Sequence, residues 1–458
     1  MFWLWLTSTI TGIKEKTVCP VPASIVKKYA TLGARLGGLG VGYAGGLGVL
    51  VLCLFLGLNP GKIPFDVILI IMAVISAISA MQKAGGLDYL VKIAEKILRK
   101  HPKQINYLAP SVAYFLTILA GTGHTVFSLI PVIVEVSQSQ NIKPKAPLSL
   151  AVVSSQVAIT ASPVSAAVVF MSGILEPLGA NYLTLLMVWI PTTFLACMLT
   201  AFIMGFTDLK LDSDPHYLER LKAGKISPPK IKEEKETSKS AKLSLWIFIG
   251  GVVAIVFYAS AISKNIALIS PVILGRDYAI VSFMLSVATL IVIFCKINAN
   301  EIAHSSVFKS GMQACVCVLG VAWLGDTFVS NHIDEIKRYA SFLIADYPFL
   351  LAVALFLASM LLYSQAATSK ALIPSVITAL GISANHTEHL YIIVASFASV
   401  SALFVLPTYP TLLGAIAMDN TGTTKMGRYV FDHAFLIPGV LVVFLSVALG
   451  FVVAPLVL

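Results

Sequence analysis

The chain has 458 residues, of which 57% are hydrophobic and 12% are charged, and its mean hydropathy is +0.89. These values leave too little polar surface for a water-soluble protein of this length, so they exclude a soluble enzyme or binding domain. The formal net charge of +10 would fit a nucleic-acid-binding protein, but Lys and Arg cluster in short gaps between apolar segments, as in the loops of membrane proteins.

Residues 1–30 form an atypical N-terminal segment. Only Met1–Ile10 are apolar, and Lys14–Lys16 follow, so the apolar part is too short to cross a bilayer. The segment also lacks the basic start and small-residue cleavage site of a signal peptide. Two interpretations stay open: the first span is replaced or lost, or the reading frame upstream of about Ala30 is not the original one.

Residues 31–207 form a first membrane repeat in this interpretation. One apolar segment contains the polar turn Ala120–Thr125, which predicts a helical hairpin, and another is interrupted at Thr160–Ser165. The predicted membrane segments of this repeat are 36–57, 63–82, 107–136 (the hairpin), 149–173 (the interrupted span) and 181–207.

Residues 208–242 are too charged and too rich in proline to enter lipid or form a second domain, and we predict a solvated cytoplasmic linker. A second membrane repeat, 243–458, follows. It contains a hairpin with a turn at Tyr363–Lys370 and a span interrupted at Leu406–Thr411. Its predicted membrane segments are 243–263, 279–295, 310–330, 347–379 (the hairpin), 391–416 (the interrupted span) and 433–457.

The two repeats match at a constant offset of 243 residues. Leu129-Ile130-Pro131 then falls on Leu372-Ile373-Pro374, and Thr125 falls on Thr368. A hairpin returns to its starting side, so each repeat crosses the membrane an odd number of times and the repeats should be inverted. We therefore predict an all-α polytopic membrane protein, an inverted-repeat secondary carrier with two re-entrant hairpins and two interrupted helices.

The distribution of basic residues supports this topology. With both termini in the periplasm, the predicted cytoplasmic gaps hold 24 of the 32 Lys and Arg residues, and the external gaps hold five.

The two turns and two breaks form the predicted substrate site. An anionic substrate needs partial positive charges that are not full buried ions, and the N-terminal ends of broken helices supply them. The alternatives are tight turns packed between helices and simple proline kinks. The candidate binding residues are Thr122, His124, Thr125, Thr160, Ser162, Ser364, Gln365, Thr368, Ser369, Lys370 and Thr408.

Charged residues near membrane depth are few. Lys370 either pairs with a substrate carboxylate, or reaches an interface or pairs with Glu135 or Asp326, and both interpretations stay open. Glu135, Asp326 and Asp419 are weaker candidates for gating or coupling. For the Asp419 turn, a helix end and cap is an equally good interpretation.

No metal site or cofactor is predicted. The six cysteines lack metal-site spacing, and Gly40–Gly45 fits a nucleotide-binding glycine pattern but lies inside an apolar segment with no strand before it. We interpret those glycines as helix-packing residues.

Five long strings closely resemble the anaerobic C4-dicarboxylate transporters of the Dcu A/B type. They are NPGKIPFDVILIIMAVISAISAMQKAGGLDYLV (59–91), AITASPVSAAVV (158–169), GVAWLGDTFVSN (320–331), LLYSQAATSKALIP (361–374) and LFVLPTYPTLLGAIAMDNTGTTKMG (403–427). The chain departs from the family at Lys27-Lys28-Tyr29, where an apolar helix is expected.

The resemblance implies a multi-pass carrier in the inner membrane of a Gram-negative bacterium. It would take up fumarate, malate or aspartate in exchange for succinate during anaerobic fumarate respiration. A homodimer is an expectation by analogy only.

Other functions remain as alternatives. These are a cation/proton antiporter or another anion carrier on a related fold, and a membrane protein that senses dicarboxylates without transporting them. An intramembrane enzyme would need a catalytic set such as HExxH, paired aspartates or Ser with Lys. The apolar segments lack the first two, and Ser364 with Lys370 is the only Ser/Lys candidate, so we predict no enzymatic activity. The expected partners are small dicarboxylates and the lipid bilayer, with no nucleic acid.

Overall fold

The structure is a computed structural model that describes residues 39–63, 65–206, 210–224, 226, 238–262, 268–332, 347–362, 364–406, 409–425 and 431–458. Within these residues every regular element is a helix, and the only β pairings are two isolated bridges. The predicted all-α fold is therefore confirmed for the described chain. The prediction for the N-terminal segment 1–30 lies outside the described residues.

The first part of the chain forms helices whose ends follow the predicted turns and breaks closely. They are α3 (Gly40–Leu56), α4 (Phe65–Lys83), α5 (Gly86–Lys100), α6 (Ile105–Ala120), α7 (Ile130–Ser139), α8 (Lys145–Val157), α9 (Ala166–Leu175) and α10 (Tyr182–Met204), with the short 3-10 helices η1 (Pro102–Gln104), η2 (Gly123–Ser128), η3 (Ala158–Ala161) and η4 (Glu176–Leu178).

The rest of the chain continues with another set. It comprises α11 (Pro215–Lys222), α12 (Lys239–Ala261), α13 (Arg276–Phe294), α14 (Ser306–Asn331), α16 (Leu350–Leu362), α17 (Gln365–Ala379), α18 (Leu390–Ser396), α19 (Pro410–Met418) and α20 (Leu436–Val457), with η5 (Ala299–His304) and η6 (Phe397–Phe404).

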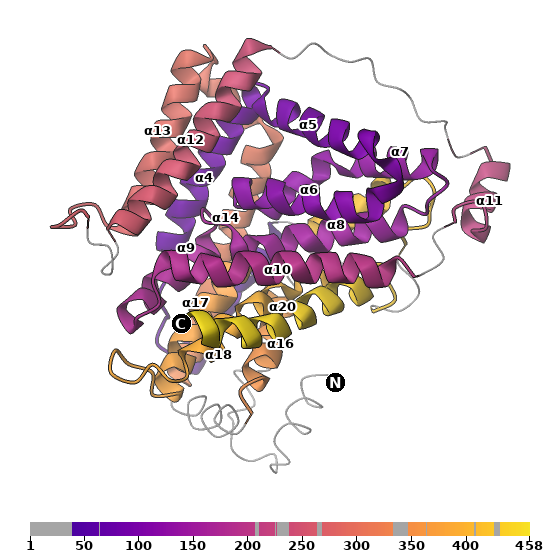
Figure 1. The fold of residues 1–458 in the computed structure, drawn as a ribbon. Helices are drawn as coiled ribbons and strands as arrows, with labels where there is room; N and C mark the ends of the chain where they lie inside the picture. Colours follow the sequence, from indigo (N-terminus) through magenta and orange to yellow (C-terminus); the bar gives the residue numbers. More distant parts are fainter. Residues whose placement is uncertain are drawn as a thin grey trace.

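Two groups of helices pack around separate apolar cores. In Figure 1, α4, α12 and α13 stand side by side, and α6, α8, α10 and α20 run across them. The first group buries Ile78, Phe248 and Met284 in one cluster. The second buries Tyr114 and Phe397 in a larger cluster that also includes the hairpins and interrupted helices.

Several helices expose the apolar side chains expected at a lipid boundary. In the most apolar 18-residue windows of α12, α13 and α20, only 28–33% of the residues are buried. Trp246, Phe257, Ile293 and Phe444 are all at least 60% exposed. Because a water-soluble surface does not carry so many exposed large apolar residues, this surface fits a bilayer.

Five helical stretches within the described residues are long and apolar enough to cross a membrane. A sixth results if the bent pair Ile68–Lys83 and Gly86–Lys100, with an angle of 75°, is counted as one span. The five are Lys145–Leu178, Tyr182–Met204, Lys239–Ala261, Asp277–Phe294 and Leu436–Val457.

The ends of the first hairpin lie at one end of α10. The Asn106 side-chain amide at the start of α6 donates to the Ala201 carbonyl oxygen near the C-terminal end of α10, at 2.9 Å. After α7, the Leu211 N–H donates to the Asn141 carbonyl oxygen at 3.0 Å. The start of α6 and the end of α7 therefore lie near the same end of α10, the C-terminal end.

The loop after α17 lies near the other end of α10. A Cβ atom built on Gly179, just before α10, would lie 4.0 Å from the Thr387 Cγ2 atom. The loops that follow the two hairpins thus lie at opposite ends of the same helix.

The structure adds local detail to three predicted segments. The gap between the predicted spans 63–82 and 107–136 contains helix α5, whose apolar Leu87 and Leu98 are buried while Lys96 is exposed, so the segment is an amphipathic helix. The linker at 208–242 contains the short helix α11, because Asp214 caps its first turn and Pro215 begins it. The turn predicted at Tyr363–Lys370 is shorter, since α17 already begins at Gln365.

Candidate functional site

The first hairpin turn packs against the first helix break. Helix α6 ends at Gly121 with φ 66°, a left-handed conformation that favours glycine. A Cβ built there would lie 3.0 Å from Val164 Cγ2. The Thr125 hydroxyl, in a side chain that is only 4% exposed, donates to the Thr122 carbonyl oxygen at 3.2 Å and lies 3.3 Å from the Thr117 hydroxyl.

The first interrupted helix is held open by its own serines and threonines. The Thr160 hydroxyl donates to the Val157 carbonyl oxygen at 2.7 Å, and the Ser162 backbone is extended at φ −81° and ψ 123°. Ser165 caps α9: its hydroxyl oxygen accepts from the Val168 N–H at 3.2 Å. The Ser162 hydroxyl donates to the Ile118 carbonyl oxygen at 2.6 Å, which joins the break to the first hairpin.

The second hairpin presents a similar capped helix start. The Ser364 hydroxyl oxygen accepts from the Ala367 N–H at 3.2 Å, while its carbonyl oxygen accepts from the Thr368 N–H and hydroxyl. The Ser369 hydroxyl donates to the Gln365 carbonyl oxygen at 2.8 Å. Thr368 and Ser369 are fully buried, so the start of α17 is polar and enclosed.

Gln156, at the end of α8, links these segments. Its side-chain amide donates to the Thr411 hydroxyl in the first turn of α19 at 3.2 Å, and its backbone carbonyl oxygen accepts from the Gln365 side-chain amide at 3.1 Å. The Gln156 side chain is fully buried, and no described residue forms a hydrogen bond with its Oε1 atom. The end of α8 thus connects the second hairpin to the second interrupted helix.

Gln156 therefore joins the first interrupted helix to the second hairpin and to the second interrupted helix. Ser162 joins the first interrupted helix to the first hairpin. Of the predicted binding residues, Thr125, Thr160, Ser162, Gln365, Thr368 and Ser369 are buried in these segments. Ser364 and Lys370 are half-buried at the start of α17, and Thr122 is half-buried in the first turn. His124 lies in η2, but its side chain is outside what the structure describes, as is the whole of Thr408.

Sequence reasoning missed Gln156 and Thr411 as individual site residues. A signal for Gln156 was present, since it is an amide in an otherwise apolar run one turn before the Thr160–Ser165 break. An amide buried at such a position requires hydrogen-bond partners, which only distant segments of the chain could supply.

The three residues predicted as weaker candidates for gating or coupling each make contacts that stabilise the fold. Glu135 forms an ion pair with Arg99 at 2.8 Å. The Asp326 carboxylate accepts from the Lys62 N–H at 2.6 Å, and so holds the loop between α3 and α4 against α14. Asp419 ends α19, and its carboxylate accepts from the N–H groups of Thr421 and Thr424.

Metal chemistry has no donor set in the described residues. No group of three or more His, Cys, Asp or Glu side chains in that part of the chain could hold a metal ion. The polar centre instead offers amides and helix starts, whose N–H groups fit the carboxylate oxygens of an organic anion.

Comparisons with known proteins point to one family. A family profile described as "Anaerobic c4-dicarboxylate membrane transporter" matches residues 21–458. A protein of Helicobacter pylori named C4-dicarboxylate transporter DcuA is 98% identical over 427 residues, which cover 93% of this chain and 96% of that protein. The Escherichia coli K12 protein of the same name is 55% identical over 424 residues, covering 92% and 95%.

One more distant sequence and one solved structure extend the comparison. The anaerobic C4-dicarboxylate transporter DcuB of Escherichia coli O6:H1 is 36% identical over 441 residues, covering 92% of this chain and 95% of that protein. The crystal structure of the Alcanivorax borkumensis YdaH transporter superposes with a TM-score of 0.53 at 14% identity, covering 94% of this chain and 96% of that chain. At that identity the likeness concerns the fold alone.

Proposed function

This chain belongs to the family of anaerobic C4-dicarboxylate membrane transporters, and on that premise we propose that it exchanges fumarate, malate or aspartate for succinate across a bacterial inner membrane. The coarser part of this function, transport of C4-dicarboxylates, follows from the family. The exchange mode, the site and the membrane topology are the proposal, and exchange would support anaerobic fumarate respiration as the resemblance implies.

The observation that carries the site is the convergence of the breaks on Gln156. The starts of α9, α17 and α19 all belong to this connected polar centre. Helix N-terminal ends carry partial positive charge and backbone N–H groups, so together they can bind carboxylates without a full buried cation at each position. Lys370, in the second turn of α17, adds one formal positive charge for a substrate carboxylate.

The Gln156 amide can present donors to the substrate by rotating. The Thr411 hydroxyl is both donor and acceptor, so a 180° rotation of the amide lets Thr411 donate to Oε1 in place of accepting from Nε2. The same rotation turns the NH₂ group to the position of the oxygen that now has no partner. A carboxylate arriving there would receive charge-assisted hydrogen bonds, which gives this buried amide a use.

Three features support an inverted repeat. Adding 243 to the bounds of α8, Lys145–Val157, gives 388–400, which α18 and η6 occupy. Adding 243 to the bounds of α9, Ala166–Leu175, gives 409–418, which matches α19. At the same offset α3 corresponds to α13 and α4 corresponds to α14. Helix α3 packs on α14 and α13 packs on α4, so the same contact occurs twice, with the two repeats exchanged. The loops that follow the two hairpins lie at opposite ends of α10, as inversion requires.

Alternating access follows from this arrangement in our proposal. The hairpin turns would reach the midplane from opposite sides, so opening one side would expose the same carboxylate site that the other side closes. Exchange results when the empty carrier reorients more slowly than the loaded one.

Counterflow in proteoliposomes tests the proposal. Vesicles are loaded with unlabelled succinate, labelled fumarate is added outside, and uptake is compared with that of empty vesicles. We expect accumulation that depends on internal succinate and a large loss in Lys370→Gln. Lys96→Gln, which removes an exposed charge from α5, is the matched control and should retain exchange.

The outcomes separate the alternatives. Equal uptake with and without internal succinate would reject exchange while leaving dicarboxylate transport intact. Specific fumarate binding without any uptake would favour a sensing protein. Full exchange by Lys370→Gln would remove this lysine from the proposed site.

A further inference from the structure

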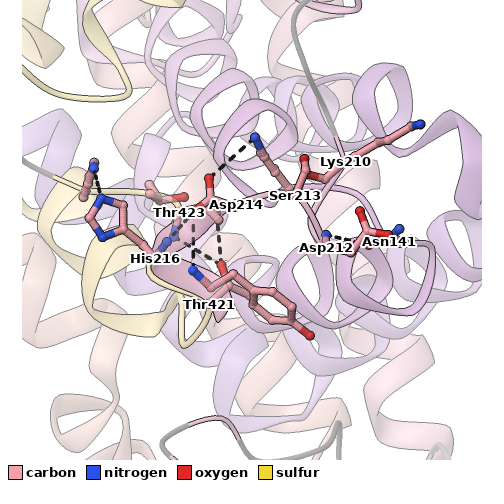
Figure 2. Close-up of polar contacts among 12 residues, drawn as sticks. Asn141, Lys210, Asp212, Ser213, Asp214, His216, Thr421 and Thr423 are labelled. Carbon is pink, nitrogen blue, oxygen red and sulfur yellow. Dashed lines mark hydrogen bonds and ion pairs between the residues drawn. The ribbon is translucent and has the colours of Figure 1, made fainter. Parts of the chain in front are cut away.

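Helix α11 is docked against the loop that follows the second interrupted helix. Asp214 caps the first turn of α11 by accepting from the His216 N–H at 3.0 Å (Figure 2). Its other carboxylate oxygen lies 3.5 Å from the Lys143 ammonium. At the other end of α11, the Arg220 guanidinium donates to the Asn420 carbonyl oxygen at 3.0 Å. The part of the linker described as α11 is therefore fixed to both repeats.

The loop at residues 419–425 has a self-contained hydrogen-bond network. The Asp419 carboxylate, in a side chain that is 2% exposed, accepts from the N–H and hydroxyl of Thr421, from the Thr423 hydroxyl and from the Thr424 N–H. Gly422, with φ 74°, allows the Arg220 side chain to pass closely, since a Cβ there would lie 3.0 Å from Arg220 Cδ. The Asp419 charge is thus satisfied inside the loop.

A cavity of about 340 Å³ lies between α11 and this loop. Its lining includes His216, Glu219 and Arg220 from α11 and Asp419, Thr424 and Lys425 from the end of α19 and the loop. Thr424 is 1% exposed, and its buried hydroxyl has no hydrogen-bond partner among the residues that the structure describes. The Lys425 ammonium donates to the His216 imidazole, so two basic groups meet across the cavity.

We infer that this cavity binds a small oxyanion, a carboxylate or phosphate group held by Arg220, Lys425 and the Thr424 hydroxyl. The buried hydroxyl has a free hydrogen to donate, and the two cations supply charge-assisted hydrogen bonds. Of the two acids in the lining, Asp419 is hydrogen-bonded within the loop, whereas the Glu219 carboxylate on α11 would repel a bound anion. The bound anion would strengthen the attachment of the linker to the end of α19.

The inference does not depend on the transport cycle, because the cavity shares no residue with the polar centre around Gln156. Two sources can supply the ligand chemistry: a C4-dicarboxylate, which is also the proposed cargo, and inorganic phosphate. Their effects are measured in separate arms of one experiment.

Protection of Lys425 from acetylation tests the site. The purified full-length protein is exposed briefly to an amine-acetylating reagent in the presence of succinate, inorganic phosphate or chloride at constant ionic strength, and each lysine is quantified by peptide mass spectrometry. We expect succinate or phosphate to lower acetylation of Lys425 severalfold. Lys222, which is exposed on the same helix outside the cavity lining, is the internal control.

Variants connect the protection to the cavity. Arg220→Gln, at an exposed position, should abolish it, Thr424→Val should raise the ligand concentration needed severalfold, and Glu219→Gln should lower that concentration. Lys239→Gln, at the exposed start of α12, is the matched control for loss of a positive charge and should retain protection.

The result identifies the ligand or overturns the inference. Protection by succinate alone assigns the site to a dicarboxylate, and protection by both assigns it to oxyanions in general. The inference would be overturned if acetylation of Lys425 were the same in succinate, phosphate and chloride. Undiminished protection in Arg220→Gln would also overturn it. Loss of protection in Lys370→Gln would also overturn it, because the effect would then come from the transport centre.

Discussion

Replacing Gln156 by leucine separates substrate binding from folding stability. The substitution keeps the approximate volume of the side chain and removes the hydrogen bond to Thr411, which contributes about 1 kcal/mol. It also removes the buried Oε1 atom that has no partner, whose burial costs about 1–3 kcal/mol. The bond from Gln365 is unaffected, because it ends on the Gln156 backbone carbonyl.

These contributions oppose each other, so we expect the free energy of unfolding to stay the same or to rise by up to about 2 kcal/mol. Substrate binding should weaken much more. A hydrogen bond to a charged group contributes about 1.5–3 kcal/mol, so its loss should raise KM for fumarate by about 10- to 150-fold.

Counterflow rates over a range of fumarate concentrations measure KM, and unfolding in detergent measures stability. Gln104→Leu, which removes an exposed glutamine from η1, is the matched control and should change neither quantity. An unchanged KM in Gln156→Leu would refute the assignment of this amide to the substrate. A loss of stability of several kcal/mol with no independent effect on KM would show that the amide serves only the fold.

Three further substitutions test the arrangement around the site. In a cysteine-free background, Asn141→Cys and Thr387→Cys, both at exposed positions, should react with an impermeant maleimide from opposite sides of the membrane, and labelling from one side would contradict the inverted repeat. Gly121→Ala should lower the free energy of unfolding by about 1–2 kcal/mol because its φ is 66°, whereas Gly173→Ala, with open space around its Cβ position, should not destabilise the protein. Asp419→Asn places an NH₂ group against existing donors and should cost about 1–3 kcal/mol, measured by unfolding in detergent, and an unchanged stability would contradict the observed network.

The sequence predicted the helix breaks well because their causes are local. Gly121 and Ser165 act through their own backbone and side chain, and helices end or begin within a residue of each. The start of α17 was placed too late, because the polar run from Ser364 was interpreted as a turn although its hydroxyls bond back within a helix.

The contacts between distant segments could not be read from local pattern. The link from Gln156 to Thr411 spans 255 residues, and the docking of Arg220 on Asn420 spans 200. Composition indicated that the segment containing Arg220 is solvated, which is compatible with an exposed helix as much as with an irregular linker. Only the packing of segments far apart in the sequence decides that such a helix has a surface to dock on.

The hydroxyl groups at the breaks cannot be the main donors to the substrate. Each has one hydrogen, and the hydrogens of Thr160, Ser162, Ser165, Thr368 and Ser369 are all donated to backbone carbonyl oxygens. Their oxygens can then only accept, as a carboxylate does, so the two repel unless an internal bond is broken.

Our proposal therefore assigns substrate binding to the N–H groups at the helix starts, the rotated Gln156 amide and the Lys370 ammonium. We therefore expect Ser162→Ala and Thr368→Val to lower stability by about 0.5–1.5 kcal/mol each with little change in KM, while Gln156→Leu and Lys370→Gln raise KM. Counterflow and unfolding measured on the same four proteins check this division. A large rise in KM for Ser162→Ala without loss of stability would contradict this division. It would mean that the Ser162 hydroxyl leaves the Ile118 carbonyl and donates to the substrate.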